Sequence, residues 1–224
     1  MSYPDTCVVI PVYNEDQVIG GVVQHVLAAF DHVVCVDDGS SDRTLEALEA
    51  TGALVLRHPI NLGQGAALQT GIEFALADPS IATIVTFDAD GQHQVADAVT
   101  MVDRLHTDDL DIVFGSRFLD DRTNVGWAKR AVLKVAVRYT NASTGLQLTD
   151  AHNGLRVFNR AVGTKLDIRQ DGMAHASEIV ATVAHERFRY TELAVHIVYT
   201  DYSRSKGQSL LNSVNILFDM VFRP

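Results

Sequence analysis

The stretch Ile81-Ala-Thr-Ile-Val-Thr-Phe-Asp-Ala-Asp-Gly-Gln-His93 decides how the rest of the chain is interpreted. It begins as a nearly continuous run of β-branched and aromatic residues, which is typical of a strand buried on both faces of a sheet. It ends on two carboxylates, Asp88 and Asp90. Because side chains alternate along a strand, we expect both to point to the same side where the strand leaves the sheet. Hard oxygen ligands in this arrangement suit Mg²⁺ or Mn²⁺, with substrate phosphates completing the coordination shell.

An Asp-rich turn in solvent would explain the same letters, because Asp-x-Asp occurs often by chance. Gln92 and His93 follow the pair directly and offer further polar contacts. The neighbouring stretches therefore have to decide between a metal site and an ordinary turn.

The composition is that of an ordinary globular protein. The chain has 224 residues, of which 47 % are hydrophobic and 21 % are charged, enough for one sizeable α/β domain. Its net charge of −10 argues against a nucleic-acid binder, which needs a basic surface. Any bound phosphate must be met by a local basic cluster or by a metal.

The sequence also predicts where the protein works. Cys7 and Cys35 lie inside apolar runs and are expected to be buried thiols in a reducing compartment. The first residues lack the features of a signal peptide, and no apolar run approaches the ~20 residues that span a bilayer. We therefore expect a cytoplasmic protein without a membrane span in this sequence.

Short β-branched runs alternate with helical patterns, which predicts a mostly parallel central sheet flanked by helices. The predicted strands are Cys7–Tyr13, His32–Asp37, Ala53–Leu56, the run before Asp88, Asp111–Arg117, a strand entered from Asp150, and Thr191–Tyr199. The predicted helices begin at Asn14–Asp16, within His58–Ala67, at Val95, at Trp127, near Met173 and at Leu210. A polar loop, Tyr202–Ser209, precedes the last helix.

The turn after the second predicted strand reads Asp37-Asp-Gly-Ser-Ser-Asp42. Carboxylates there suit hydrogen bonding to a base or a ribose, while the Gly-x-Gly-x-x-Gly fingerprint of dinucleotide binding is absent. An Asx turn followed by a helix cap also explains these residues. Taken by themselves, they favour this structural interpretation over nucleotide binding.

The predicted helix Trp127–Thr144 is basic in an otherwise acidic chain. Its positive residues are Lys129, Arg130, Lys134 and Arg138, and its neighbouring apolar positions are Trp127, Ala131, Val135 and Tyr139. The pattern fits a solvated basic face or an anion site at the mouth of an apolar groove, with Arg117 nearby in sequence. The residues alone favour neither.

Four motifs then occur in a fixed order. They are Ile10–Glu15, Val36–Asp42, Asn61–Gly65 and Phe87–His93. Together they resemble the inverting family-two glycosyltransferases with the GT-A fold, in particular the dolichol-phosphate (polyprenyl-phosphate) mannose synthases. The likeness continues through Gly115–Arg117, Asp150–Arg156, Glu178 and Arg204–Gly207, so it covers nearly the whole chain.

The resemblance implies a role for each matching residue. The residues implied to bind the donor nucleotide-sugar are Pro11, Tyr13, Glu15, Asp37, Asp38, Gly63, Asp88, Ala89, Asp90 and Arg204. Asp90 and Gln92 are implied to hold Mg²⁺ or Mn²⁺, and Arg117, Arg130 and Lys134 to receive the acceptor phosphate. Asp88, Asp90, Arg117 and Arg204 form the implied catalytic set. One domain, 1–224, would then divide into a nucleotide-binding half, about 1–115, and an acceptor-binding half, about 116–224.

The implied reaction is metal-assisted transfer of a hexose, with inversion, to a polyprenyl or dolichyl phosphate at the membrane surface. GDP-mannose is the leading donor, ahead of UDP-glucose or a UDP-N-acetylhexosamine. A phosphate acceptor is already anionic and needs little proton abstraction, with metal and arginine neutralising the departing diphosphate. A sugar-hydroxyl acceptor would need a base, for which Asp150 or Glu178 are the candidates.

Three other functions have to be weighed against transfer to a polyprenyl phosphate. A nucleotidyltransferase would be expected to carry a Gly-rich triphosphate loop with a lysine near the first strand, which 11–20 lacks. A glycosyltransferase acting on a glycan hydroxyl and a non-catalytic nucleotide-sugar-binding protein are the alternatives. Gly91 and Gln94 depart from the family pattern, as does the lack of appended transmembrane helices. We expect this protein to lie peripherally at the cytoplasmic membrane face, with room for a separate membrane-protein partner.

Overall fold

A single seven-stranded sheet organises the molecule, with strand order β3-β2-β1-β4-β6-β5-β7. The computed structural model describes residues 3–120, 127–170 and 175–198. The strands are β1 (Thr6–Val12), β2 (His32–Asp37), β3 (Leu54–Arg57), β4 (Thr83–Thr86), β5 (Ile112–Ser116), β6 (Arg156–Asn159) and β7 (Tyr190–Ala194). Within this part of the chain only β6 runs antiparallel to its neighbours. The mostly parallel sheet predicted from the sequence is confirmed.

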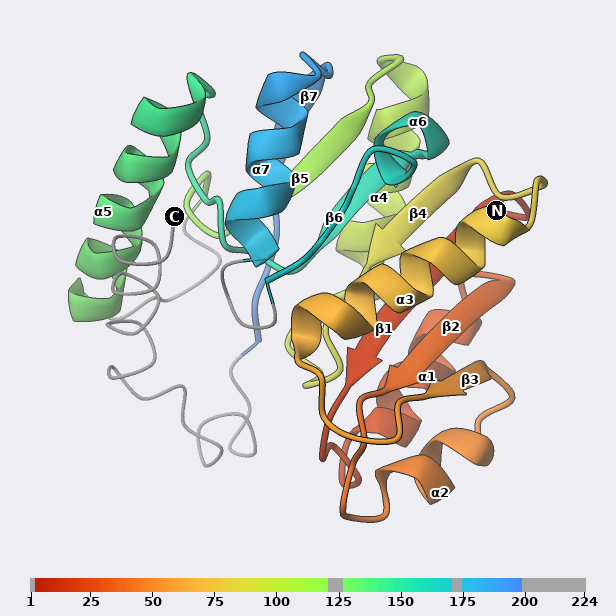
Figure 1. The fold of residues 1–224 in the computed structure, drawn as a ribbon. Helices are drawn as coiled ribbons and strands as arrows, with labels where there is room; N and C mark the ends of the chain where they lie inside the picture. Colours follow the sequence, from red (N-terminus) through yellow and green to blue (C-terminus); the bar gives the residue numbers. More distant parts are fainter. Residues whose placement is uncertain (1–2, 121–126, 171–174, 199–224) are drawn as a thin grey trace.

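Helices cover both faces of this sheet (Figure 1). They are α1 (Ile19–Leu27), α2 (Thr44–Glu49), α3 (Gln64–Ala77), α4 (Val95–Thr107), α5 (Trp127–Thr144), α6 (Arg160–Gly163) and α7 (His175–His185). Apolar residues of α1 and α4 pack on one face, and those of α3, α5 and α7 on the other. Among the described helices, none is both long and apolar enough to cross a bilayer.

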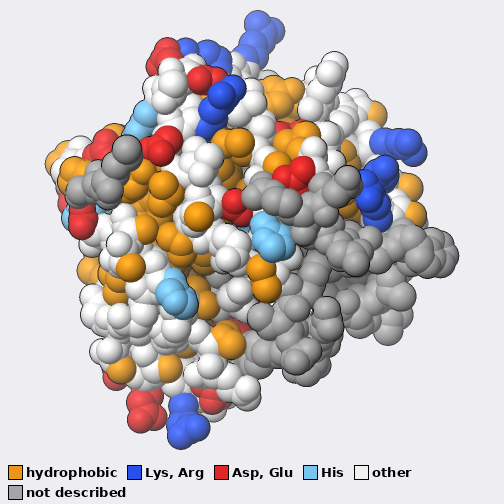
Figure 2. Space-filling view, turned by 180° about the vertical axis from the view of Figure 1, so that it is seen from behind, with side chains coloured by type: hydrophobic (Ala, Val, Ile, Leu, Met, Phe, Trp, Pro, Cys, Tyr) orange, Lys and Arg blue, Asp and Glu red, His pale blue; other side chains and the backbone are white. Residues whose placement is uncertain are grey.

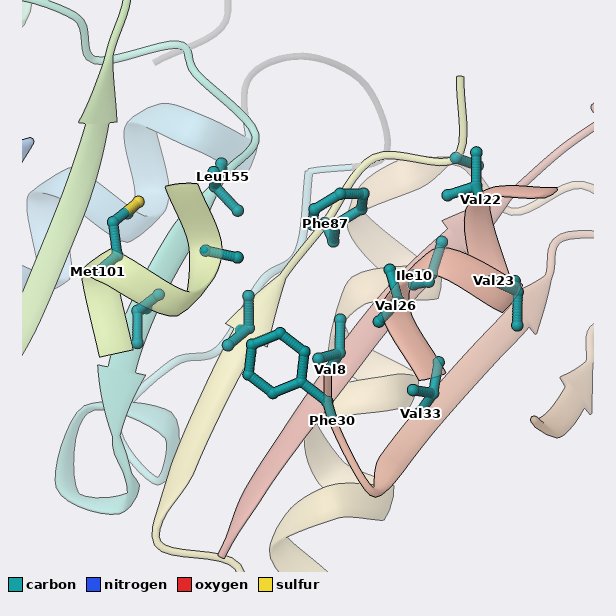
Figure 3. Packing of buried hydrophobic residues seen from close by; sticks show 14 of the residues in the cluster. Val8, Ile10, Val22, Val23, Val26, Phe30, Val33, Phe87, Met101 and Leu155 are labelled. Atoms are coloured by element: carbon teal, nitrogen blue, oxygen red, sulfur yellow. The ribbon is translucent and has the colours of Figure 1, made fainter. Parts of the chain in front are cut away.

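Alternation along β1 explains why its sequence is apolar at nearly every position. Val8 and Ile10 face α1 and α4, whereas Cys7 and Val9 belong to the core on the opposite face. Figure 3 shows Val8 and Ile10 packed beside Val26 and the neighbouring side chains of α1. Complete burial of a side chain such as Ile10 contributes about 1.5–3 kcal/mol.

The surface over α1 and α4 is the face seen from behind in Figure 2. Charged side chains lie mostly toward its edges, and hydrophobic and uncharged side chains make up most of the rest, with some acidic and His side chains near the middle. The net charge of −10 is therefore not gathered at the centre of this face.

The direction of the strands brings the polar motifs to one edge of the sheet. The parallel strands β1, β2, β4 and β5 all end there, so the residues that follow Val12, Asp37, Thr86 and Ser116 meet at this edge. The antiparallel strand β6 instead begins at this edge, at Arg156, which pairs with Thr86 and with Phe114. Carboxyl ends of parallel strands are the usual location of ligand sites in open α/β sheets.

Three predicted boundaries differ from the structure. The last predicted strand, Thr191–Tyr199, is β7 and already ends at Ala194. Helix α1 begins at Ile19 rather than at Asn14–Asp16, because Asn14 adopts a φ of 54° and its side chain accepts the N–H of Ser41 at 2.9 Å. Strand β4 ends at Thr86, so Asp88 and Asp90 lie in the turn that follows it. The predicted loop 202–209 and helix 210–222 lie outside the described residues.

Both cysteines are buried free thiols, as predicted. Burial raises the pKa of Cys7 and of Cys35 to about 12, so neither is a nucleophile at neutral pH.

Candidate functional site

A cavity of about 500 Å³ opens at the carboxyl edge of the sheet. It is lined by residues from β1, from the turns after β2 and β4, from α5, and from the start of α7. Ten residues predicted from the sequence line it, namely Pro11, Tyr13, Glu15, Asp38, Gly63, Asp88, Ala89, Asp90, Gln92 and Arg117. The structure therefore brings most of the predicted site together.

Asp88 is held from two sides. His93 Nε2 lies 2.8 Å from Asp88 Oδ2, and the Gln64 side-chain amide donates to Asp88 Oδ1 at 3.3 Å. His93 in turn packs edge-on against Phe87, with ring centroids 5.5 Å apart. Burial by itself raises the pKa of Asp88, but His93, Arg156 and His175 together outweigh it and leave the pKa below its ordinary value. Asp88 is therefore an ionised, oriented carboxylate rather than a proton donor.

Asp90 has the opposite electrostatic environment. Burial and then the charge of Asp88 raise its pKa to about 6, and its Oδ1 accepts the backbone N–H of Gln92 at 3.0 Å. A carboxylate that is costly to ionise alone is stabilised by a cation, so the donor set of Asp90 and Gln92 fits a divalent metal ion. Within the described ranges, no three His, Cys, Asp or Glu residues are grouped to hold a metal. Substrate oxygens would complete the shell, which is how Mg²⁺ is commonly bound.

The two carboxylates at the end of β2, Asp37 and Asp38, serve different purposes. Both oxygens of Asp38 are engaged by the loop after β3: Oδ1 lies 2.7 Å from His58 Nδ1, and Oδ2 accepts the N–H of Gly63 at 2.8 Å. Asp37 is fully buried outside the cavity lining, where Oδ1 accepts the N–H of Ser40 at 3.1 Å. Asp37 thus forms a local turn, and Asp38 reaches the cavity while it shapes the loop.

Arg117 forms a buried ion pair with Asp150. Its Nε and Nη2 donate to the two carboxylate oxygens at 2.6 and 2.8 Å, and its backbone N–H donates to Asp150 Oδ2 at 3.1 Å. Burial alone raises the pKa of Asp150, but Arg117 outweighs it and lowers the pKa below its ordinary value. The guanidinium of Arg117 lies 5.8 Å from the centroid of the Phe118 ring, and that of Arg130 lies 5.7 Å from the same centroid. Phe118 therefore brings together two of the predicted acceptor arginines.

Helix α5 presents three of its basic residues, Arg130, Lys134 and Arg138, to solvent. Arg130 and Lys134 are exposed and do not line the cavity, whereas Leu133 does. Val135 and Tyr139, predicted to form an apolar face, are 53 % and 49 % exposed. The helix packs instead through its buried residues Leu133, Ala136, Val137 and Thr140. The side chains of Trp127 and Lys129, and the whole of Arg204, lie outside the described part of the chain.

The structure adds cavity residues to which the sequence had assigned no role, although several lie in the stretches Asn61–Gly65 and Asp150–Arg156. They are Gln64, Leu133, His152, Asn153, Gly154, Arg156 and His175, among others. Arg156 carries the clearest missed signal, because it stands inside the apolar run Leu155-Arg-Val-Phe158, where a charged residue in a strand is otherwise out of place. A charge at such a position indicates either a buried partner or a ligand.

Comparison with known proteins identifies the family. Residues 7–166 match the model of "Glycosyl transferase family 2". A UDP-N-acetylglucosamine–dolichyl-phosphate N-acetylglucosaminyltransferase of Methanococcus voltae is 26 % identical over 95 % of this chain and 93 % of its own length. The polyprenol monophosphomannose synthase of Mycolicibacterium smegmatis is 28 % identical over 94 % of this chain and 82 % of its own length.

Solved structures share the fold. Glucosyl-3-phosphoglycerate synthase from Mycobacterium tuberculosis, in complex with Mn²⁺, uridine diphosphate and glucosyl-3-phosphoglycerate, aligns with a TM-score of 0.72. The alignment covers 97 % of this chain and 77 % of that protein, at 18 % sequence identity. The predicted GT-A arrangement of the sheet and its helices is thereby confirmed.

Proposed function

The chain belongs to glycosyl transferase family 2, and from this premise we propose that it transfers a hexose from a nucleoside-diphosphate sugar to a polyprenyl phosphate, with inversion. The donor occupies the cavity at the carboxyl edge of the sheet. Its nucleoside lies against Pro11, Tyr13 and Glu15, beside the loop that Asp38 holds. Its sugar reaches the oriented carboxylate of Asp88.

Asp90 and Gln92 would hold a divalent cation, Mg²⁺ or Mn²⁺, which supplies Lewis-acid neutralisation of the departing diphosphate. The residues of the chain orient the two reactants and exclude water from them. An oxygen of the acceptor phosphate forms a bond to the anomeric carbon while the bond from that carbon to the diphosphate oxygen breaks. The electron pair leaves with the nucleoside diphosphate, and no proton has to be removed.

The observation that supports a phosphate acceptor is the state of the two residues that could act as a base. Asp150 is fully buried and bound by Arg117 through both oxygens. Glu178 Oε2 accepts the backbone N–H groups of Arg169 and Gln170 at 3.1 and 3.0 Å. Neither lines the cavity. An acceptor that needs no base therefore suits this site better than a sugar hydroxyl.

GDP-mannose remains our leading donor, followed by UDP-glucose and a UDP-N-acetylhexosamine. Of the two relatives above, one is named for UDP-N-acetylglucosamine and the other for a phosphomannose product. Both names contain a polyprenol or dolichyl phosphate, which supports the acceptor class more than any one donor. The acceptor tail would lie at a membrane, and we propose peripheral association of the half that begins near residue 116 with the cytoplasmic membrane face.

The test is a donor panel with Mn²⁺ or Mg²⁺. Purified protein is incubated with GDP-mannose, UDP-glucose or UDP-N-acetylglucosamine, and nucleoside diphosphate release is measured with and without a short polyprenyl phosphate. We expect one donor to be turned over much faster when the lipid phosphate is present. Acceleration by a free sugar and not by the lipid phosphate would support the glycan alternative. Donor binding without any turnover would indicate a non-catalytic nucleotide-sugar-binding protein.

A further inference from the structure

Arg156 is a buried cation whose hydrogen bonds are unfilled. It is 1 % exposed, and none of its three guanidinium nitrogens has a hydrogen-bond partner in the described structure. Leaving such donors without acceptors costs folding free energy, so native proteins normally fill them. A guanidinium in this state at the wall of a cavity indicates a ligand that supplies the missing acceptors.

The neighbours of Arg156 in the cavity wall are hydrogen-bond donors too. Neither ring nitrogen of His152 has a partner among the described residues, and the same holds for Nδ2 of Asn153. The side-chain oxygen Oδ1 of Asn153 accepts the backbone N–H of Leu155 at 2.9 Å, which fixes the orientation of the side-chain amide. Burial lowers the pKa of His152 to about 4, so its ring is neutral at pH 7 and offers one N–H.

A helix end adds to the same wall. His175 and Ala176, in the first described turn of α7, line the cavity together with Arg156. The N-terminal end of an eleven-residue helix carries a partial positive charge that favours anions. Unfilled donors, a buried guanidinium and this helix end together describe a site for an oxyanion.

Strand register places this site between the two halves of the cavity. Arg156 pairs with Thr86 of β4 on one side and with Phe114 of β5 on the other. Thr86 lies two residues before Asp88, and Phe114 lies three residues before Arg117. Arg117 is hydrogen-bonded to Asp150. The charges of Asp88 and Asp150 also favour the cationic form of Arg156, but neither forms a hydrogen bond with its guanidinium, which leaves those donors for a ligand. Burial lowers the pKa of Arg156 to about 10, so it is still a cation at neutral pH.

We propose that Arg156, assisted by Asn153, His152 and the first turn of α7, binds the phosphate monoester of the acceptor. This inference rests on the proposed function and names its acceptor-phosphate site. The guanidinium fork would take two phosphate oxygens and direct a third at the anomeric carbon beside Asp88. The contact between His93 Nε2 and Asp88 Oδ2, at 2.8 Å, weakens the repulsion between the Asp88 carboxylate and this anion.

The test uses the complete chain and a short, water-soluble prenyl phosphate. Binding of this probe is measured by calorimetry without donor, and its KM is measured with the donor that the panel identifies. Arg156→Gln is expected to weaken probe binding and to raise its KM by about 10- to 100-fold, as for loss of charge-assisted hydrogen bonds. Affinity for nucleoside diphosphate with metal should stay within about twofold. Arg156→Lys, which keeps the charge without the fork, should recover part of the loss.

Two controls accompany these variants. Arg104→Gln removes an exposed arginine of α4 and should leave both measurements unchanged. His152→Phe keeps a buried ring but removes its N–H, and it should raise the probe KM by a smaller factor, about 3- to 10-fold. If Arg156→Gln does not fold, this variant still tests the proposed site.

The outcomes separate this site from the proposed function. Probe binding that depends on Arg156 in a protein that does not transfer to the probe would support the site and contradict the function. Transfer with equal probe affinity in wild type and Arg156→Gln would overturn the site alone. Weaker affinity for the intact donor, with unchanged affinity for nucleoside diphosphate and for the probe, would assign Arg156 to the sugar and also overturn it.

Discussion

The carboxylate of Asp88 lies directly against the Cα of Gly154. A Cβ built on Gly154 would lie 2.6 Å from Asp88 Cγ and closer still to both oxygens. The hydroxyl of Thr86 donates to the carbonyl of Gly154 at 2.7 Å and holds the two segments together. Since His93 contacts the same carboxylate, Asp88 is fixed between a histidine and a residue that has to be glycine.

We therefore expect Gly154→Ala to displace Asp88 and to lower kcat by about 10- to 100-fold, the loss that a misplaced catalytic group produces. Affinity for nucleoside diphosphate should change little. Gly21→Ala is the matched control, because a Cβ there, in the first turn of α1, meets nothing within 4 Å. That control should keep full activity and stabilise the protein by about 0.5–1 kcal/mol. Equal kcat values in the two variants would show that Asp88 tolerates displacement.

The raised pKa of Asp90 predicts opposite effects on stability and on metal binding. Its pKa of about 6 exceeds the ordinary value of 3.8, so the folded apoprotein holds a proton that the unfolded chain has lost. Its contribution to stability is therefore present at low pH and is lost as pH rises from about 4 through about 6. Asp90→Asn removes the free-energy cost of ionising this buried carboxylate beside Asp88. The variant should therefore stabilise the apoprotein at pH 7.5 by on the order of 1–3 kcal/mol.

With metal and nucleotide bound, wild type should become more stable than Asp90→Asn. Mn²⁺ with nucleoside diphosphate should raise the melting temperature of wild type, and Asp90→Asn should abolish that rise together with turnover. With metal below saturation, turnover of wild type should increase with pH through about 6, because Asp90 of the apoprotein must ionise before it binds the cation. Thermal melts at pH 4.5 and 7.5, with and without Mn²⁺ and nucleotide, measure both effects. An unchanged metal response in Asp90→Asn would remove Asp90 from the metal site.

The ion pair of Arg117 and Asp150 predicts a loss of stability in addition to any effect on the acceptor. Arg117→Ala leaves a fully buried carboxylate without its cation, which costs about 3–5 kcal/mol. Because the pKa of Asp150 lies below its ordinary value, the pair stabilises the protein at neutral pH and loses this contribution in acid. Urea unfolding of Arg117→Ala at pH 7 measures the cost.

The control for this pair is the exposed ion pair of Arg104 and Asp108, one helical turn apart on α4. Arg104→Ala should cost about 0.5 kcal/mol or less. In the double variant Arg117→Ala/Asp150→Asn, part of the lost stability should return, because no charge is left buried alone. A double variant less stable than Arg117→Ala would mean that Asp150 contributes through other bonds.

The sequence predicted the sheet well because both faces of its strands are buried. Strand β2 matches its predicted range, His32–Asp37, and α5 matches Trp127–Thr144. The start of α1 was missed because a side-chain contact from Asn14 to the turn after β2 keeps the preceding residues out of the helix. No local pattern reveals a partner 27 positions away in the chain.

The candidate site was predicted where adjacent residues act together and missed where distant ones do. Asp88 and Asp90 share one turn, so the sequence places them together. The ion pair of Arg117 and Asp150 joins segments 33 residues apart, and it is made possible by the antiparallel insertion of β6 beside β5. The position of Arg156 at the cavity depends on the same insertion, which alternating patterns do not specify.

The last prediction separates two basic residues of α5. Arg130 lies over the Phe118 ring that also contacts Arg117, whereas Arg138 is two turns further along and exposed. If the acceptor phosphate approaches past Phe118, Arg130→Glu should raise the KM for a short polyprenyl phosphate several-fold at saturating donor. The introduced negative charge would oppose the incoming anion. Arg138→Glu makes the same change of charge away from the cavity and should leave this KM near wild type. Equal increases in both variants would mean that the whole basic face acts through its general charge, and 0.5 M salt should then remove the effect.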